Sequence, residues 1–472
     1  MRIPLPIASP DGNVHGGQVG MTRMDRRSFM GAMASAACLS HEVAPSWKCA
    51  DAIRDENPGE FVLQRPSPLD RARKVSMIGF GGVRLPVASG NLGSHTDPVD
   101  FDCTARYVDY ALEHGINWFD SAYGYHAGQS EMAMGRALRR HPRESFWFCT
   151  KVPCHCIASP ADARRIFEEQ LQRTGLGYFD VYYLHSLMRK EDYERAFLLS
   201  GALEYLREEK SRGRIRHLGF SFHGNEAFMD YLLETQDWDV AIILMNGLDW
   251  RGKGLSELLL GKLRARDIPA VGMQSLAGGR LARLKPEARK VLESRRPGLS
   301  DAGWALKFAA EREGVMTAMT GFTRFEHLRE NIRIFNGATY RPLAQDDVAA
   351  YLEAVRVESG GADGVPCPGC GYCIPCPYGV DIPGVFRWWN EKVRSNAFSS
   401  VNGTGARESI RAILKEYSAT FGRFRGAERC IGCGRCEKVC PQWQRFRVSE
   451  ELSKIDRYVE GLRQSASCYR CN

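Results

Sequence analysis

The chain has no run of apolar residues long enough to cross a membrane as a helix. Such a helix needs about 20 consecutive apolar residues, and no segment of the 472-residue sequence approaches that. Blocks of like charge are also missing, because the formal net charge of +8 is spread along the chain. We therefore expect neither a transmembrane segment nor a nucleic-acid partner, and the length allows two or three globular domains.

Internal repeats are absent too, apart from two short cysteine runs near the C-terminus. The runs are Cys367-x2-Cys370-x2-Cys373-x2-Cys376 before Pro377, and Cys430-x2-Cys433-x2-Cys436-x3-Cys440 before Pro441. Three thiolates at this spacing converge on one cluster, and a fourth, followed by proline, ligates a second one. The second run matches bacterial two-cluster ferredoxins at every position, whereas the first is one residue short before Cys376. The runs therefore predict two [4Fe–4S] clusters.

Zinc is the main alternative, because paired C-x2-C motifs also form tetrahedral zinc sites. The C-x2-C-x2-C spacing with a trailing Cys-Pro favours iron–sulfur clusters, and disulfides would not explain cysteines spaced three apart in both runs. In a two-cluster unit the ligation crosses over. Cys440 would then complete the cluster of the first run, and Cys376 that of the second.

The N-terminal segment resembles an export signal. Arg26-Arg27-Ser28-Phe29-Met30-Gly31 precedes a short, mildly apolar segment, and Ala34-Ser35-Ala36 resembles a cleavage site. A twin arginine before a weakly hydrophobic segment is typical of Tat signals. We expect residues 1–40 to be a Tat signal region and the protein to be periplasmic or otherwise exported. The alternative is a cytoplasmic protein with a disordered basic arm.

Residues 71–345 alternate short apolar segments with amphipathic ones, after a linker predicted at residues 41–70. Alternating strands and helices favour a parallel sheet, and eight such units favour an α/β fold of the (β/α)8 TIM barrel type. The predicted strands are Met77–Phe80, Asn117–Asp120, Trp147–Lys151, Asp180–Leu184, Arg216–Phe220, Val240–Met245, Pro269–Gln274 and Thr317–Thr320.

The pattern changes after residue 345. A helix is predicted at Asp346–Glu358, and two more at Val385–Arg394 and Arg407–Phe421, between the cysteine runs. Hairpin signals are absent there. Residues 346–472 are therefore predicted to form a small, mostly helical ferredoxin-like domain.

Four polar side chains follow predicted barrel strands, at the ends where TIM barrels carry their functional residues: Asp120, Tyr125, Lys151 and His185. The surrounding motifs resemble those of the aldo/keto reductases almost throughout the barrel. They are Ile78-Gly79-Phe80-Gly81-Gly82, Gly115-Ile116-Asn117-Trp118-Phe119-Asp120-Ser121-Ala122, Phe148-Cys149-Thr150-Lys151, Tyr182-Tyr183-Leu184-His185, Gly213-Arg214-Ile215-Arg216, Gly278-Gly279-Arg280-Leu281 and Glu330-Asn331. With the twin arginine and the cysteine runs, the chain is similar to a bacterial subgroup of that family.

The resemblance implies that Tyr125 donates a proton while a nicotinamide delivers hydride to a carbonyl carbon. Free tyrosine has a pKa of about 10, and a neighbouring ammonium lowers the pKa by favouring phenolate. We expect Lys151 to supply that charge and Asp120 to hold Lys151 in place. His185 is expected to orient the carbonyl oxygen.

The cofactor positions match the family less closely. The resemblance assigns cofactor contacts to Ser221, Met273, Arg324, Glu330 and Asn331. However, phenylalanine replaces the usual asparagine after Ser221, and Met273 replaces the stacking aromatic. NADP(H) is the expected cofactor, on an altered nicotinamide platform.

Four further cysteines lie in short motifs. Cys154-His155-Cys156 follows Lys151, and Cys468-x2-Cys471 ends the sequence. Two thiols as close as Cys154 and Cys156 are strained as ligands of one ion, so we expect that segment to pack as a loop. The terminal pair is expected to remain as unliganded thiols.

Together these features predict an aldo/keto reductase-like oxidoreductase acting on a carbonyl compound or linked redox substrate, with an electron-transfer protein as a candidate partner. Hydride transfer moves two electrons whereas each cluster moves one, and no flavin motif is evident to join them. One alternative is therefore an electron-transfer iron–sulfur protein with a catalytically vestigial barrel. The other is a zinc-stabilised tail on an ordinary reductase.

Overall fold

The computed structural model describes residues 58–468 except positions 91–96, 252–253, 360–363, 396, 403–404, 423 and 443–445. The predicted Tat signal, Cys471 and the side chain of Cys468 lie outside the described residues. Within these ranges, no helix has both the length and the apolar character that a membrane span requires.

Eight parallel strands close into a barrel in the order β10-β3-β4-β5-β6-β7-β8-β9, which confirms the predicted TIM-barrel fold. Their side chains are almost continuously buried, as expected for parallel strands covered on both faces. The strands are β3 (Ile78–Gly81), β4 (Trp118–Asp120), β5 (Trp147–Pro153), β6 (Phe179–Leu187), β7 (Ile215–Phe222), β8 (Val240–Leu244), β9 (Ala270–Met273) and β10 (Val315–Thr320).

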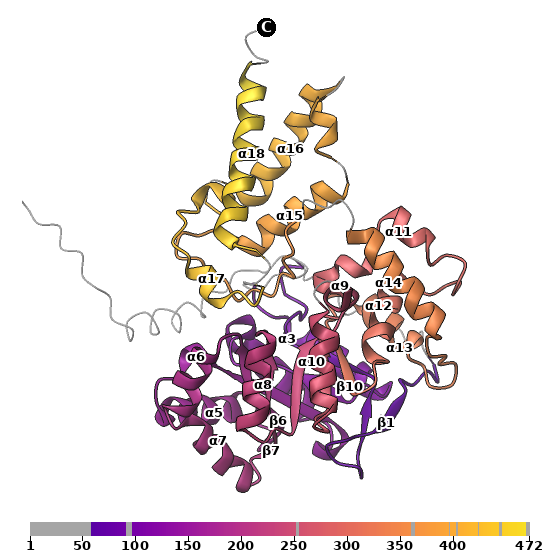
Figure 1. Cartoon of the computed structure of the whole chain (residues 1–472), viewed down its shortest axis with the longest axis vertical. Helices are drawn as coiled ribbons and strands as arrows, with labels where there is room; N and C mark the ends of the chain where they lie inside the picture. The colour runs from indigo at the N-terminus through magenta and orange to yellow at the C-terminus, as the bar shows by residue number, and fades with distance from the viewer. Residues whose placement is uncertain are drawn as a thin grey trace, which may run out of the picture. The chain divides into compact units, whose positions relative to one another are not determined.

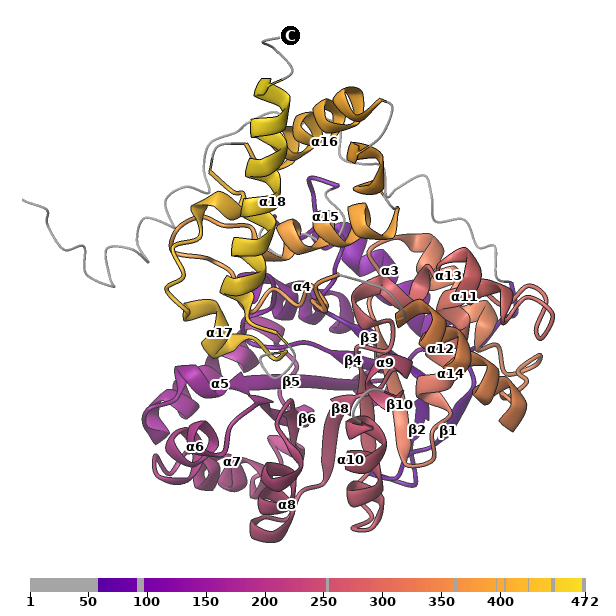
Figure 2. The ribbon, with the colours of Figure 1, turned by 45° about the horizontal axis from the view of Figure 1, so that its top comes forward.

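Helices follow the strands and cover the outside of the barrel (Figures 1 and 2). Four of them, α3, α5, α8 and α12, begin directly after a residue whose side chain caps the helix. For example, the Ser159 side chain accepts the Asp162 N–H and Pro160 occupies the first turn of α5, an arrangement that favours helix initiation. The helices are α3 (Phe101–Glu113), α4 (Gln129–Leu138), α5 (Pro160–Thr174), α6 (Lys190–Tyr193), α7 (Ala202–Ser211), α8 (Glu226–Thr235), α9 (Gly247–Arg251), α10 (Leu255–Arg264), α11 (Pro286–Lys290), α12 (Asp301–Ala310) and α13 (Phe325–Ile334).

A short hairpin covers the N-terminal end of the barrel. Strand β1 (Gln64–Pro66), inside the segment predicted as a linker, pairs antiparallel with β2 (Lys74–Ser76). The Lys74 carbonyl accepts hydrogen bonds from Asn117 Nδ2 and Trp147 Nε1, at the starts of β4 and β5. The hairpin therefore leaves the opposite rim, where the strands end, for the functional groups.

The barrel packing continues through α14 (Gln345–Ser359). Tyr351 and Val355 of α14 share a buried cluster with Trp304 and Phe308 of α12. The apolar face of α14 thus belongs to the barrel, although the sequence pattern places the barrel's end at residue 345.

The C-terminal region has its own core. Trp388, Tyr417 and Ile455 lie in a separate buried cluster, built from α15 (Ile382–Arg394), α16 (Ala406–Phe421) and α18 (Val448–Cys468), with the short α17 (Arg435–Val439) beside the second cysteine run. These helices are the orange and yellow elements of Figure 1. No strand occurs in the described part of this region, as the sequence predicts.

Candidate active site and cysteine pocket

The barrel brings Asp120, Tyr125, Lys151 and His185 together at its C-terminal rim. Asp120 ends β4, Lys151 lies in β5, His185 lies in β6, and Tyr125 begins the 3-10 turn η2 (Tyr125–Gly128). Lys151 Nζ donates to the Asp120 carboxylate and, at 2.7 Å, to the Ser121 carbonyl. The same ammonium lies 5.1 Å from the centre of the Tyr125 ring, and the Tyr125 and His185 ring centres are 5.7 Å apart.

Lys151 and Asp120 form a buried ion pair, with the two residues 3% and 6% exposed. Burial alone would lower the pKa of Lys151, but the Asp120 carboxylate outweighs it and holds the pKa above its usual value. Such pairs add little net stability, because desolvation offsets their attraction. The pair instead fixes a positive charge beside Tyr125.

Tyr125 and His185 are both neutral in this environment. Burial raises the pKa of Tyr125, and the nearby Lys151 ammonium only partly opposes that effect. The pKa of His185 lies well below its usual value because of burial and, secondly, the Lys151 charge. Lys151 therefore opposes the rise expected for a buried tyrosine, but the net shift is upward, contrary to the lowering that the charge pattern alone suggests.

A buried hydrogen-bond network supports the strand that carries Lys151. The fully buried Glu131 of α4 accepts hydrogen bonds at 2.5 Å from Thr150 Oγ1 and Gln170 Nε2, and at 3.0 Å from Arg173. Gln170 also donates to the Lys151 carbonyl at 3.2 Å. These contacts fix β5 and hence the starting point of the Lys151 side chain.

A fifth residue, Tyr372, enters the site from the first cysteine run, and the sequence analysis did not identify it. Its hydroxyl lies 2.5 Å from His185 Nε2 and 3.4 Å from the Tyr125 hydroxyl. The one available signal was a bulky aromatic in a two-residue spacer between cysteines. The run therefore contributes a side chain to the barrel site.

Two barrel residues hold the segment that carries Tyr372. Arg84, beyond β3, donates to the carbonyls of Pro368 and Gly369 at 2.9 and 3.1 Å. Gly278 has a positive φ of 70°, and a Cβ there would lie 2.5 Å from the Pro368 carbonyl oxygen. The backbone at Pro368 and Gly369 thus packs directly against Arg84 and Gly278 of the barrel.

The predicted cofactor residues lie in the second half of the barrel, from β7 to α13. Ser221 ends up in β7, where its hydroxyl accepts the Ser186 N–H at 2.7 Å, and Met273 is the last residue of β9. Arg324 is exposed and precedes α13, whose N-terminus has no side-chain cap, while Glu330 and Asn331 lie within that helix. An uncapped helix start beside an arginine is suited to a phosphate.

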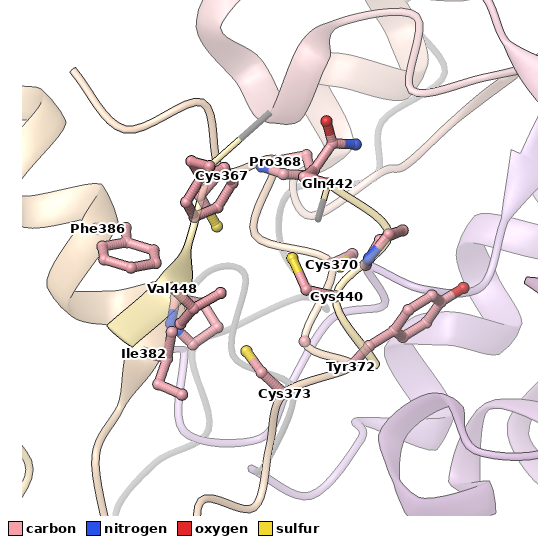
Figure 3. A pocket seen from close by; sticks show the side chains of 14 residues that line it. Cys367, Pro368, Cys370, Tyr372, Cys373, Ile382, Phe386, Cys440, Gln442 and Val448 are labelled. Atoms are coloured by element: carbon pink, nitrogen blue, oxygen red, sulfur yellow. The ribbon is translucent and has the colours of Figure 1, made fainter. Parts of the chain in front are cut away.

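Four cysteines surround one pocket in the C-terminal region. Cys367, Cys370 and Cys373 line it together with Cys440 of the second run, and Figure 3 shows their side chains around a common space, with the Tyr372 ring directed away from it. Burial raises the pKa of Cys367 and Cys440 to about 12. Soft thiol donors that are costly to ionise alone fit a positively charged metal centre, which displaces their protons.

The spacing of the thiols bears on the type of metal centre. A zinc site holds its thiolate sulfurs about 2.3 Å from one ion. Among the described residues, no group of three or more histidine, cysteine or acidic side chains is gathered closely enough for a single ion. The choice between zinc and an iron–sulfur cluster therefore rests on the cysteine spacing in the sequence and not on the positions of these thiols.

The other cysteines differ in their surroundings. Within the second run, Cys433 is exposed while Cys430 and Cys436 are partly buried. Cys154 donates to the His185 carbonyl at 3.3 Å, and burial raises its pKa to about 12. The Cys154–Cys156 turn thus packs beside His185, which fits its predicted role as a loop.

In comparison with known proteins, the barrel and the C-terminal region match two different protein families. The model of the aldo/keto reductase family matches residues 78–355, and that of a 4Fe-4S dicluster domain matches residues 366–446. A probable aldo-keto reductase of Glycine max is 30% identical over 156 residues, which are 31% of this chain and only 42% of that protein.

Other relatives match over nearly their whole length. L-galactose dehydrogenase of Arabidopsis thaliana is 24% identical over 306 residues, covering 60% of this chain and 92% of that protein. The solved holo form of an aldo-keto reductase from Bacillus halodurans superposes with a TM-score of 0.51 and 21% identity, covering 62% of this chain and 96% of that one.

Proposed function

Because this chain belongs to the aldo/keto reductase family and is an oxidoreductase with a 4Fe-4S domain, we propose that it reduces a carbonyl compound with a nicotinamide cofactor, NADP(H), and carries two [4Fe–4S] clusters. The observation that carries the carbonyl chemistry is the placement of Tyr125 beside the Lys151–Asp120 pair and His185. These four side chains lie at one rim of the barrel, where Tyr125 can act as a proton donor and the other three can position and stabilise it.

Tyr125, Lys151 and His185 have different proposed roles in the reduction. A nicotinamide held at this rim would supply the hydride for the carbonyl carbon. Tyr125 would give its proton to the carbonyl oxygen, so that an alcohol forms. The Lys151 ammonium stabilises the resulting phenolate, because an opposite charge favours the ionised form. Neutral His185 orients the oxygen through Nε2.

The cofactor is proposed to lie across the rim from Ser221 and Met273 to the start of α13. Arg324 and the free N–H groups of that helix would hold a phosphate, while Glu330 and Asn331 would complete the adenosine end. The test is anaerobic purification of the full chain, analysis of iron, sulfide and bound nucleotide, and NADPH oxidation with 4-nitrobenzaldehyde.

The pH profile should follow from the neutral states of Tyr125 and His185. Reduction needs protonated Tyr125, whose pKa lies above its usual value because of burial. The rate of carbonyl reduction should therefore stay level from roughly pH 6 to pH 9 and fall only beyond the usual tyrosine pKa of about 10. An inflection near pH 6.5 would show that His185 titrates during turnover.

A second candidate function is electron transfer by the iron–sulfur domain with a vestigial barrel. The contact of Tyr372 with His185 favours it, because the hydroxyl lies where a reacting oxygen is needed. Binding of NADPH to the full chain separates the two functions. A chain that retains its clusters but binds no nicotinamide would support electron transfer alone.

Export is proposed to depend on Arg26 and Arg27. Replacing both with lysine should leave folded, cluster-bearing protein in the cytoplasm of a Tat-competent host, because the twin arginine is what defines the signal. Fractionation and immunoblotting measure this, with Arg23→Lys as the matched control. Wild-type protein that stays in the cytoplasm would show that the segment is not a signal.

A further inference from the structure

The Tyr372 hydroxyl occupies the point on which the two oxygen-binding groups of the barrel converge. It lies 2.5 Å from His185 Nε2 and 3.4 Å from the Tyr125 hydroxyl. Those are the groups that must hold a carbonyl oxygen if Tyr125 is to protonate it. A phenol oxygen and a substrate oxygen cannot both take this position.

We propose that Tyr372 is an internal plug that competes with the substrate's reacting oxygen for His185 and Tyr125. The inference rests on the proposed function for the roles of those two residues. A carbonyl compound reaches Tyr125 only when Tyr372 withdraws, and the vacated position accepts a small phenol as well as a carbonyl oxygen.

The plug is held in place by the barrel's own backbone and side chains. Arg84 fastens the carbonyls of Pro368 and Gly369, and Gly278 lets the Pro368 backbone approach more closely than a side chain would permit. Both contacts lie within four residues of Tyr372. Withdrawal of Tyr372 by a shift of the segment between Cys367 and Cys373 would break the Arg84 hydrogen bonds together with the contact to His185.

Tyr372 also connects ligand binding in the barrel site to the first cysteine run. Cys370 and Cys373 flank Tyr372 and line the four-cysteine pocket. Any equilibrium between seated and withdrawn Tyr372 therefore includes the geometry of these thiols, and coupling between two sites is reciprocal. Ligand in the barrel and the state of the metal centre should each bias the other.

Because only molecules with an open site bind substrate, the apparent affinity equals the intrinsic affinity multiplied by the fraction of open molecules. Tyr372→Phe keeps the ring but removes the oxygen, and with it the hydrogen bonds to His185 and Tyr125. We expect the KM for 4-nitrobenzaldehyde to fall about tenfold, the effect of losing one or two modest hydrogen bonds, with kcat unchanged. A fall in kcat at constant KM would overturn the proposal, because Tyr372 would then take part in the reaction.

Direct binding gives a measurement that needs no turnover. Tyr372→Ala in the cluster-loaded full chain removes a side chain whose shape is that of p-cresol. Calorimetry should detect p-cresol binding to Tyr372→Ala at least about tenfold more tightly than to wild type or to Tyr378→Ala. Tyr378 follows the first cysteine run and is 39% exposed. Adding His185→Phe to Tyr372→Ala should abolish the binding.

These results separate the plug from the proposed function. If p-cresol binds to Tyr372→Ala but no variant reduces the aldehyde, the plug stands and the carbonyl chemistry fails. If wild type and Tyr372→Phe reduce the aldehyde with equal KM, and p-cresol binds to wild type and Tyr372→Ala with equal affinity or to neither, the carbonyl chemistry stands and the plug is wrong.

Discussion

Replacing Tyr125 with phenylalanine should lower carbonyl reduction about 10²–10⁴-fold, the usual contribution of a positioned proton donor. The change removes one hydroxyl, while the ring keeps its packing against His185 and its place beside the Lys151 ammonium. NADPH binding should stay near the wild-type value. The measurement is steady-state NADPH oxidation with 4-nitrobenzaldehyde, together with fluorescence titration of NADPH.

Tyr123→Phe is the matched control for this change. Tyr123 lies two residues away, and its hydroxyl donates to Glu169 at 2.9 Å outside the proton-donating site. Its loss should leave the rate nearly unchanged. The pair of variants should also be measured in the Tyr372→Phe background, where the Tyr372 hydroxyl no longer competes for His185 and Tyr125. Retained reduction in Tyr125→Phe in both backgrounds would remove Tyr125 from the mechanism.

Replacing Cys440 with serine should remove one cluster and spare the other. Cys440 belongs to the second run by sequence, yet it lines the pocket of Cys367, Cys370 and Cys373. Serine is a poor substitute for a thiolate on iron, so the first-run cluster should be lost and iron and sulfide should fall by about half. Electron paramagnetic resonance of the reduced protein shows which signal disappears.

Cys376→Ser and Cys433→Ser complete this experiment. Crossed ligation predicts that both damage the cluster of the second run, although Cys376 lies in the first. If Cys440→Ser and Cys433→Ser instead remove the same signal, each run closes on its own cluster. An iron content of a single cluster in wild type would leave one run to another purpose.

The barrel could be predicted from sequence because its signals are local. Each strand is a short buried run such as Trp147–Pro153, and the spacing from Asp120 to Tyr125 lies within one strand and its following turn. The helices between the cysteine runs were predictable for the same reason. The end of the barrel was not, because the apolar face of α14 does not reveal which surface it covers.

The contact of Tyr372 with His185 could not be predicted in the same way. The two residues are 187 positions apart, and neither the cysteine spacing nor the barrel motifs specify how one part docks on the other. The direction of the Tyr125 pKa was missed for a related reason. The sequence shows that Lys151 carries a charge that lowers the pKa of Tyr125. It does not show the burial of Tyr125, which raises that pKa by more.

Arg84 has a consequence for the energetics of electron uptake. This barrel residue places a fixed positive charge against the carbonyls of Pro368 and Gly369, beside the thiols of Cys367 and Cys370. Each electron that entered a cluster held by these thiols would add negative charge, so the neighbouring guanidinium would favour the reduced form and raise the reduction potential. If the proposed first-run cluster is bound there, a residue of the barrel thereby influences how readily that cluster would accept an electron.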